Sequence, residues 1–172
     1  MLRLAHKIAP KSSQRGTAAV EFALIAMLLF ALLLGILELG RLFFVFNTAQ
    51  EITRRAAREA VVRWVDNSPS SPAKSLALFG AVSPPGIAEL TAANIQIDYL
   101  TADGVTAPDP FPTSPAANIT ACLGGSSGCI ALVKVSIVGA RYRPMAGLFP
   151  FLAIPLPAST VSMPAESLGY PV

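Results

Sequence analysis

The pattern of apolar positions changes midway through the first third of the chain. No charged residue occurs over residues 22–37, and no proline interrupts residues 17–65. A segment that is apolar on all sides is typical of a helix in lipid. As a helix, residues 17–37 would extend about 31 Å, which matches the hydrocarbon core of a bilayer. The pattern therefore predicts a membrane-spanning helix over about residues 17–38.

Beyond residue 41 the apolar positions recur every three or four residues, which predicts an amphipathic continuation of this helix to residue 65. On the opposite side Glu51 precedes Arg55, and Glu59 precedes Arg63, by four residues. That order of charges supports an exposed helix face. The apolar stripe consists of Leu42, Val45, Phe46, Ala49, Ile52, Ala56, Ala60 and Trp64.

Glu38 and Arg41 separate the two halves of this expected helix. They are the first charged residues after the apolar run, and a spacing of three puts them on one side of the helix. We therefore expect a solvated boundary pair at the membrane rim. One helix over residues 17–65 would be about 74 Å long, half in lipid and half in water.

The remainder of the chain has the composition of a linker followed by short strands and turns. Residues 66–75 are rich in Ser, Asp, Asn and Pro, and twelve of the fifteen prolines lie in residues 76–172. Alternation of apolar and polar residues predicts strands over 94–100, 130–143 and 158–163. A proline-rich loop (106–115) and an apolar connection (144–157) join them. The expected fold class is α+β, with a small antiparallel sheet packed on the amphipathic half of the long helix.

Charge is concentrated at the N-terminus. Residues 1–16 contain Arg3, Lys7, Lys11 and Arg15 and no acid, so the net charge of +3 leaves −1 for the other 156 residues. This distribution argues against a nucleic-acid surface. A basic leader before a membrane span predicts a cytoplasmic N-terminus, with the domain over residues 76–172 in the periplasm.

The two cysteines, Cys122 and Cys129, flank a Gly/Ser-rich segment. A disulfide would indicate an oxidising compartment, whereas a pair of inert free thiols is the alternative. A metal site would need more ligands than these, and the one histidine, His6, is at the other end of the chain. We also find no catalytic motif, and we expect no enzyme, cofactor, metal or small-molecule substrate.

Glu21 lies one turn into the apolar run, where an acid needs an explanation. A charged side chain at the centre of a membrane helix costs about 2.5–3.5 kcal/mol, and less towards an end. Glu21 is either an interfacial residue favoured by the positive end of the helix or a functional group. The small residues Ala18, Ala19, Ala23 and Ala26 would allow close helix packing around it.

The segment RGTAAVEFALIAMLLFALLLGILELGRLFFVFNTAQEITRRAAREA, residues 15–60, resembles the TadE-like family, pseudopilins of the Flp (tight-adherence) type IVb pilus system. The resemblance implies a pilin-like fold and cleavage between Gly16 and Thr17 by a prepilin peptidase. Thr17 would become the N-terminus, and Glu21 with Phe22 would take part in assembly, the Glu21 carboxylate pairing with the Thr17 ammonium of a neighbouring subunit.

The resemblance also implies a function. The chain would be a minor pseudopilin of the inner membrane that helps to assemble or anchor Flp-type pili, with other pilins and the Tad machinery as partners. The alternative is an uncut single-pass anchor that presents a periplasmic binding or adhesion module. A further alternative is a soluble domain released by signal peptidase.

Overall fold

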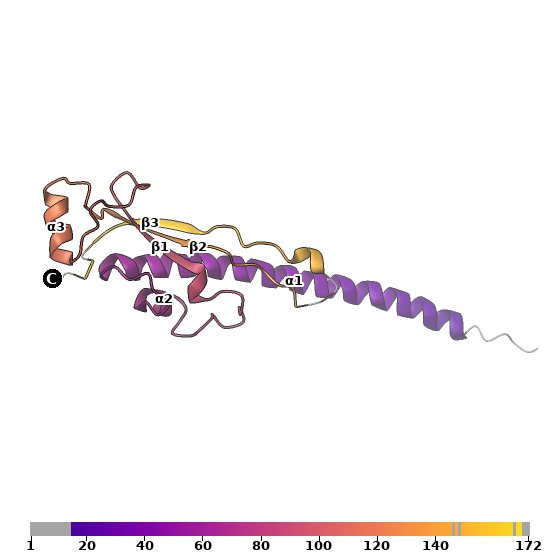
Figure 1. The fold of residues 1–172 in the computed structure, drawn as a ribbon. Coiled ribbons are helices and arrows are strands. Elements are labelled where there is room, and N and C mark those ends of the chain that lie inside the picture. The colour runs from indigo at the N-terminus through magenta and orange to yellow at the C-terminus, as the bar shows by residue number, and fades with distance from the viewer. Residues whose placement is uncertain (1–14, 146, 148, 167, 170–172) are drawn as a thin grey trace, which may run out of the picture.

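The long N-terminal helix is continuous and carries the rest of the fold at one end (Figure 1). The computed structural model describes residues 15–145, 147, 149–166 and 168–169. Helix α1 covers Arg15–Val62, 48 residues, and a three-stranded antiparallel sheet packs on it. The predicted α+β class is therefore confirmed. The leader falls, apart from its last two residues, outside the described chain.

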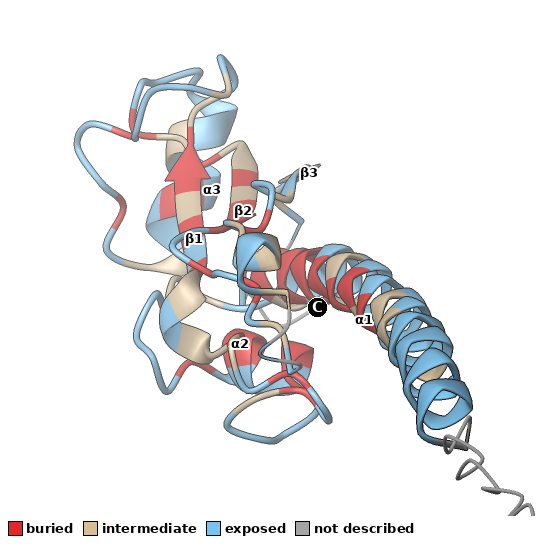
Figure 2. Cartoon of the chain, turned by 90° about the vertical axis from the view of Figure 1, so that its right-hand side faces the viewer, coloured by how far each residue is buried: buried red, intermediate tan, exposed pale blue. Residues whose placement is uncertain are grey.

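The exposure of α1 divides the helix into two halves (Figure 2). Nearly every side chain before residue 38 is exposed, and an 18-residue window with mean hydropathy 2.7 has no buried residue. The helix is thus long and apolar enough to cross a membrane. In the second half one face is buried, by Leu42, Val45, Ala49, Ile52, Ala56 and Ala60. This face is the stripe predicted from the sequence.

The sheet has the strand order β1-β2-β3, with β1 at Ile95–Leu100, β2 at Leu132–Ile137 and β3 at Thr160–Pro164. Ile97 pairs with Val135, and Val135 with Val161, so apolar residues align across one face. That face covers the buried side of α1, and Val133 and Val135 are fully buried. All three predicted strands form, although β2 ends earlier than the expected residue 143.

Helix α2 at Pro72–Ala77 corrects the predicted linker over residues 66–75. It packs against α1 and buries Ala73, Lys74 and Ala77. The Lys74 ammonium donates a hydrogen bond to the Asn67 carbonyl oxygen at 2.7 Å. Burial lowers the pKa of Lys74. The polar composition of this segment did not indicate a packed helix. A lysine can bury its aliphatic stem while its ammonium group binds a carbonyl oxygen.

Helix α3 at Pro115–Leu123 lies in a zone where the sequence predicted only strands and turns. The Ser114 side chain caps it by accepting a hydrogen bond from the Ala117 backbone N–H at 3.2 Å, and Pro115 occupies the first helical turn. Short 3-10 turns, η1 at Ala92–Asn94 and η2 at Pro150–Leu152, complete the structure. This Ser-Pro start signal is readable from the sequence.

The C-terminal segment closes the end of α1. The backbone N–H groups of Glu166 and Leu168 donate to the Val61 carbonyl oxygen, at 3.3 and 3.2 Å, and that of Gly169 to the Val62 carbonyl oxygen at 2.9 Å. These carbonyl groups have no partner within the helix. Gly169 has φ +78°, and a Cβ there would lie 2.8 Å from the Trp64 backbone nitrogen. Trp64 itself is half-buried and packs against the core, as the sequence predicted.

The helix–sheet contact should dominate the stability of the domain. Ile52 is fully buried, so Ile52→Ala should lower the free energy of unfolding by about 2–5 kcal/mol. Val82→Ala is the matched control, since Val82 is 85% exposed. Thermal unfolding in detergent, followed by circular dichroism, measures both. Equal melting temperatures for the two variants would contradict this packing.

Candidate functional site

Glu38 is buried at the point where α1 enters the domain. Its side chain is 5% exposed and accepts hydrogen bonds from the Tyr142 hydroxyl and, at 3.1 Å, from the Met145 backbone N–H. The Tyr142 hydroxyl also lies 3.2 Å from the Glu38 carbonyl oxygen. The expectation of a solvated Glu38 is therefore wrong, because the domain supplies donors to the carboxylate and covers it. Whether the residue lies at a membrane rim stays a prediction.

Arg41 connects the same turn of α1 to two other segments. Its guanidinium forms an ion pair with Glu89 at 3.1 Å and donates to the Arg143 carbonyl oxygen at 2.7 Å. It also lies over the Tyr142 ring, 5.1 Å from the centroid, and 3.9 Å from the Glu38 carboxylate. We call Glu38, Arg41, Glu89 and Tyr142 the Glu38 cluster.

The Tyr142 hydroxyl is buried within the Glu38 cluster. Burial raises the pKa of Tyr142, and the hydrogen bond to the Glu38 carboxylate raises it further, while Arg41 opposes the change. Tyr142 therefore stays a neutral donor at physiological pH. A neutral hydroxyl aimed at a buried carboxylate is a structural arrangement that holds two chain segments together.

The position of Tyr142 depends on an interruption after β2. Val133, Val135 and Ile137 are buried at odd positions, but beyond Gly139 the buried residues are Ala140 and Tyr142. Gly139 has φ +69°, a conformation that glycine adopts readily, and it shifts the alternation by one residue. Pairing then resumes, with the Tyr142 N–H donating to the Ile154 carbonyl oxygen at 2.9 Å. The β2–β3 pairing thus continues as a hairpin towards the N-terminal half of α1.

The sequence did not identify Tyr142 or Glu89 as partners of the boundary pair. A tyrosine between two arginines, Arg141 and Arg143, after a glycine that resets the strand was the one available signal. Glu89 lies in an irregular segment between α2 and η1 and has no periodicity to place it.

The predicted processing and assembly residues lie on the exposed end of α1. Gly16, Thr17, Glu21 and Phe22 are all exposed, Phe22 to 73%. Gly16 lies in the first turn of α1. The buried residues of α1 begin further along the helix, at Glu38.

Cys122 and Cys129 form a disulfide that joins the end of α3 to the segment before β2, with their Cα atoms 4.7 Å apart. Beside it the buried Asn118 accepts a hydrogen bond from the Ile130 backbone N–H at 2.7 Å. The disulfide prediction is confirmed. Within the described residues no cluster of three His, Cys, Asp or Glu side chains could hold a metal ion.

Comparison with known families identifies one segment. Residues 16–58 match the family model described as TadE-like protein. Most of helix α1 is similar to TadE-like proteins. This finding confirms the resemblance read from the sequence, over 43 of the 172 residues. No curated protein and no solved structure matches the chain significantly.

The match ends inside the part of α1 that the sheet covers, so the TadE-like segment contains both Glu38 and Arg41. The matched segment also contains the stretch of α1 that is long and apolar enough to cross a membrane. Tyr142 and Glu89, which complete the Glu38 cluster, lie outside the match. The cluster therefore joins the TadE-like helix to the remaining domain.

We expect Tyr142→Phe to destabilise the domain by about 1–3 kcal/mol, because it removes a donor from a buried carboxylate. Thermal unfolding in detergent measures the change. A double-mutant cycle with Glu38→Leu isolates the pair, since the double variant should lose less stability than the sum of the single variants. Additive losses would show that the two side chains do not interact.

Proposed function

We propose that this protein is a non-enzymatic minor pseudopilin that assembles or anchors Flp-type pili from the inner membrane. The observation that carries the proposal is the TadE-like match over residues 16–58 of α1, which include its exposed apolar half. The exposed apolar surface from residue 20 to residue 37 is free for lateral contact with lipid or with other helices. The folded domain at the far end of α1 is much larger than the short major pilins of this system, which favours a minor role.

The first step of the proposed mechanism is removal of the basic leader after Gly16. Cleavage would free the α-amino group of Thr17, four residues before Glu21 and therefore one helical turn away. It would also remove four cations that cannot enter lipid. A prepilin peptidase of the inner membrane is the proposed partner for this step.

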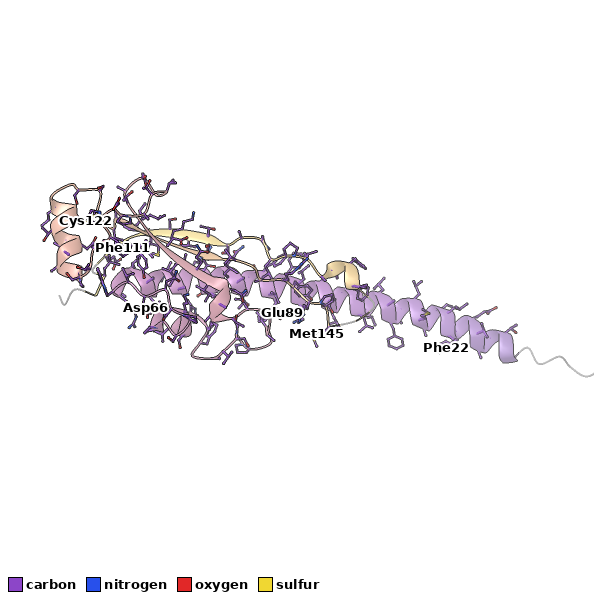
Figure 3. The ribbon with its side chains drawn as sticks, in the orientation of Figure 1. Phe22, Asp66, Glu89, Phe111, Cys122 and Met145 are labelled. Atoms are coloured by element: carbon purple, nitrogen blue, oxygen red, sulfur yellow. A yellow bond between two sulfur atoms is a disulfide. The ribbon has the colours of Figure 1, made fainter. Side chains whose placement is uncertain are left out.

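The second step is the pairing of Glu21 with the Thr17 ammonium of an adjoining subunit. Glu21 is exposed, and Figure 3 places its neighbour Phe22 on the part of α1 that projects away from the sheet domain. An ion pair with a neighbour would neutralise both charges in a poorly solvated setting. Loss of one partner of a buried pair costs about 3–5 kcal/mol, so the pair would fix the register of stacked helices.

The orientation follows from the same segment. The basic leader favours a cytoplasmic N-terminus, and the disulfide favours an oxidising compartment for the domain. We therefore propose a single span with the domain in the periplasm. An uncut anchor that presents the domain as a binding or adhesion module remains the alternative function.

Intact mass distinguishes these two functions. In cells with an active prepilin peptidase, we expect the membrane-extracted protein to begin at Thr17. Gly16→Leu should leave most of the chain uncut, because a large side chain is placed at the residue before the scissile bond. Gly40→Ala is the control, since a Cβ there meets nothing within 4 Å, and it should be processed normally. A wild-type protein that retains Met1 would favour the uncut anchor.

The register role of Glu21 is tested by Glu21→Ala. The variant should be cleaved as efficiently as the wild type, while its recovery in sheared pili, or the number of pili per cell, falls at least about tenfold for a loss of 3–5 kcal/mol. Glu51→Ala removes an exposed glutamate from the other half of α1 and should have no effect on assembly. Normal piliation of cells carrying Glu21→Ala would exclude the register role.

A further inference from the structure

The hairpin between β2 and β3 reaches back to the apolar half of α1. The Phe149 ring lies against Gly35, where an added Cβ would be 3.4 Å from the Phe149 ring carbon Cζ. Gly35 is three residues before Glu38, within the stretch predicted to span the membrane. Figure 1 shows the η2 turn beside α1 at the edge of the domain that faces the N-terminal half of the helix.

The tip of this hairpin is apolar and largely uncovered. Met145 is 78% exposed and Phe151 is 73% exposed, and the Phe149 and Phe151 rings meet edge to face at 6.0 Å. No charged residue occurs between Arg143 and Glu166. We call Met145, Phe149 and Phe151 the apolar foot. Figure 3 shows Met145 against α1, at the opposite end of the domain from Phe111 and Cys122.

The position of Gly35 sets the depth of the apolar foot. A hydrocarbon core of about 30 Å takes about 20 helical residues. If the core begins at Thr17, it ends at about residue 37, and Gly35 lies about 3 Å inside. If Glu21 marks its beginning, it ends at about residue 41, and Gly35 lies about 9 Å inside. In both registers the residue that Phe149 contacts is within the apolar layer.

The face of α1 away from the domain favours the deeper register. Leu39, Phe43 and Phe44 are 45%, 62% and 53% exposed, so apolar surface continues past Glu38 on that side. The Glu38 carboxylate does not oppose this placement, since the Tyr142 hydroxyl and the Met145 N–H solvate it.

The charges next to the foot fit a membrane surface. Arg141 and Arg143 are exposed and lie four and two residues before Met145. Arginine side chains at the edge of an apolar layer extend towards phosphate groups while their stems stay in the apolar region. Anionic lipid attracts such residues electrostatically.

We propose that the apolar foot inserts into the acyl chains of the leaflet on the domain's side of the membrane. The protein would then contact the bilayer at two sites, through α1 and through the tip of the hairpin. Because the Glu38 cluster fixes the domain on α1, the second contact would limit tilting of the whole molecule relative to the membrane. This inference requires α1 to span a bilayer, but it depends on neither leader cleavage nor pilus assembly.

Tryptophan fluorescence in vesicles tests the insertion, because Trp64 is the only tryptophan. The full chain carrying Trp64→Phe and Phe151→Trp is reconstituted into phosphatidylcholine–phosphatidylglycerol vesicles, with and without lipid brominated near the headgroup end of the acyl chains. Interfacial insertion reaches about 5–10 Å into the bilayer, so bromolipid should reduce the emission roughly twofold. Met145→Trp in the same Trp64→Phe background gives a second, independent position and should behave alike.

Phe111→Trp in the same background is the matched control, because Phe111 is exposed but lies at the far end of the domain. Its emission should be insensitive to bromolipid and should be quenched by aqueous iodide. Unchanged emission at both foot positions would overturn the proposal. Equal quenching at the foot and at Phe111 would overturn it too, since the whole domain would then lie on the membrane. Melting temperatures near that of Trp64→Phe alone establish that each variant is folded.

Discussion

A single helix has to pass from one solvent to another without a break, and the arrangement around Glu38 makes that passage possible. In lipid, α1 satisfies its backbone internally and presents apolar side chains on every side. Within the domain, one face needs a protein cover and the other needs polar groups. The change takes place within about one turn, where Glu38 and Arg41 face the domain while Leu39 and Phe43 remain exposed on other sides.

The burial of Glu38 determines the position of the domain along the axis of α1. A carboxylate without partners in a dry setting costs several kcal/mol. The Tyr142 hydroxyl and the Met145 N–H remove most of that cost, and both belong to the hairpin that extends from β2. A domain shifted by one turn along α1 would leave this carboxylate without donors. The packing of Val133 and Val135 stabilises the contact between the sheet and α1, whereas the polar contacts of Glu38 fix where the domain lies along the helix.

Local patterns in the sequence were sufficient to predict the helix, its two halves and the three strands. The apolar run before Glu38 and the stripe from Leu42 to Ala60 each follow one period, and the alternation around Ile97 and Val135 follows another. These periods reflect whether each face of an element meets lipid, water or the protein core. They can therefore be recognised from the sequence without the tertiary structure.

What the sequence could not predict depends on contacts between distant segments. Glu38 was expected in water because its donors are more than a hundred residues away and one of them is a backbone N–H. Lys74 looked like part of a linker because nothing local shows that Asn67 accepts its hydrogen bond. The burial of Tyr142 does not follow from the alternation of β2, because Gly139 has a positive φ that moves the following residues to the other face. Burial of a polar group becomes predictable only when its partner is known.

The two glutamates of the apolar helix illustrate two ways of placing a carboxylate near lipid. Glu38 is satisfied by its own chain, and the result is a fixed domain. Glu21 is 17 residues earlier, about 26 Å along the helix, and the sheet domain does not reach it. Its partner is therefore to be sought in its own N-terminal segment, in interfacial water, in lipid headgroups or in another molecule. Only the last would give a neighbour a defined position, because water and headgroups are fluid. Glu38 is hydrogen-bonded within its own chain and holds the domain rigidly on the helix. Glu21, at the other end, would pair with a neighbouring subunit and set the position of one helix against the next. This division of roles would suit the subunit of a pilus proposed above, since each protomer must be rigid before a repeating contact between protomers can be uniform.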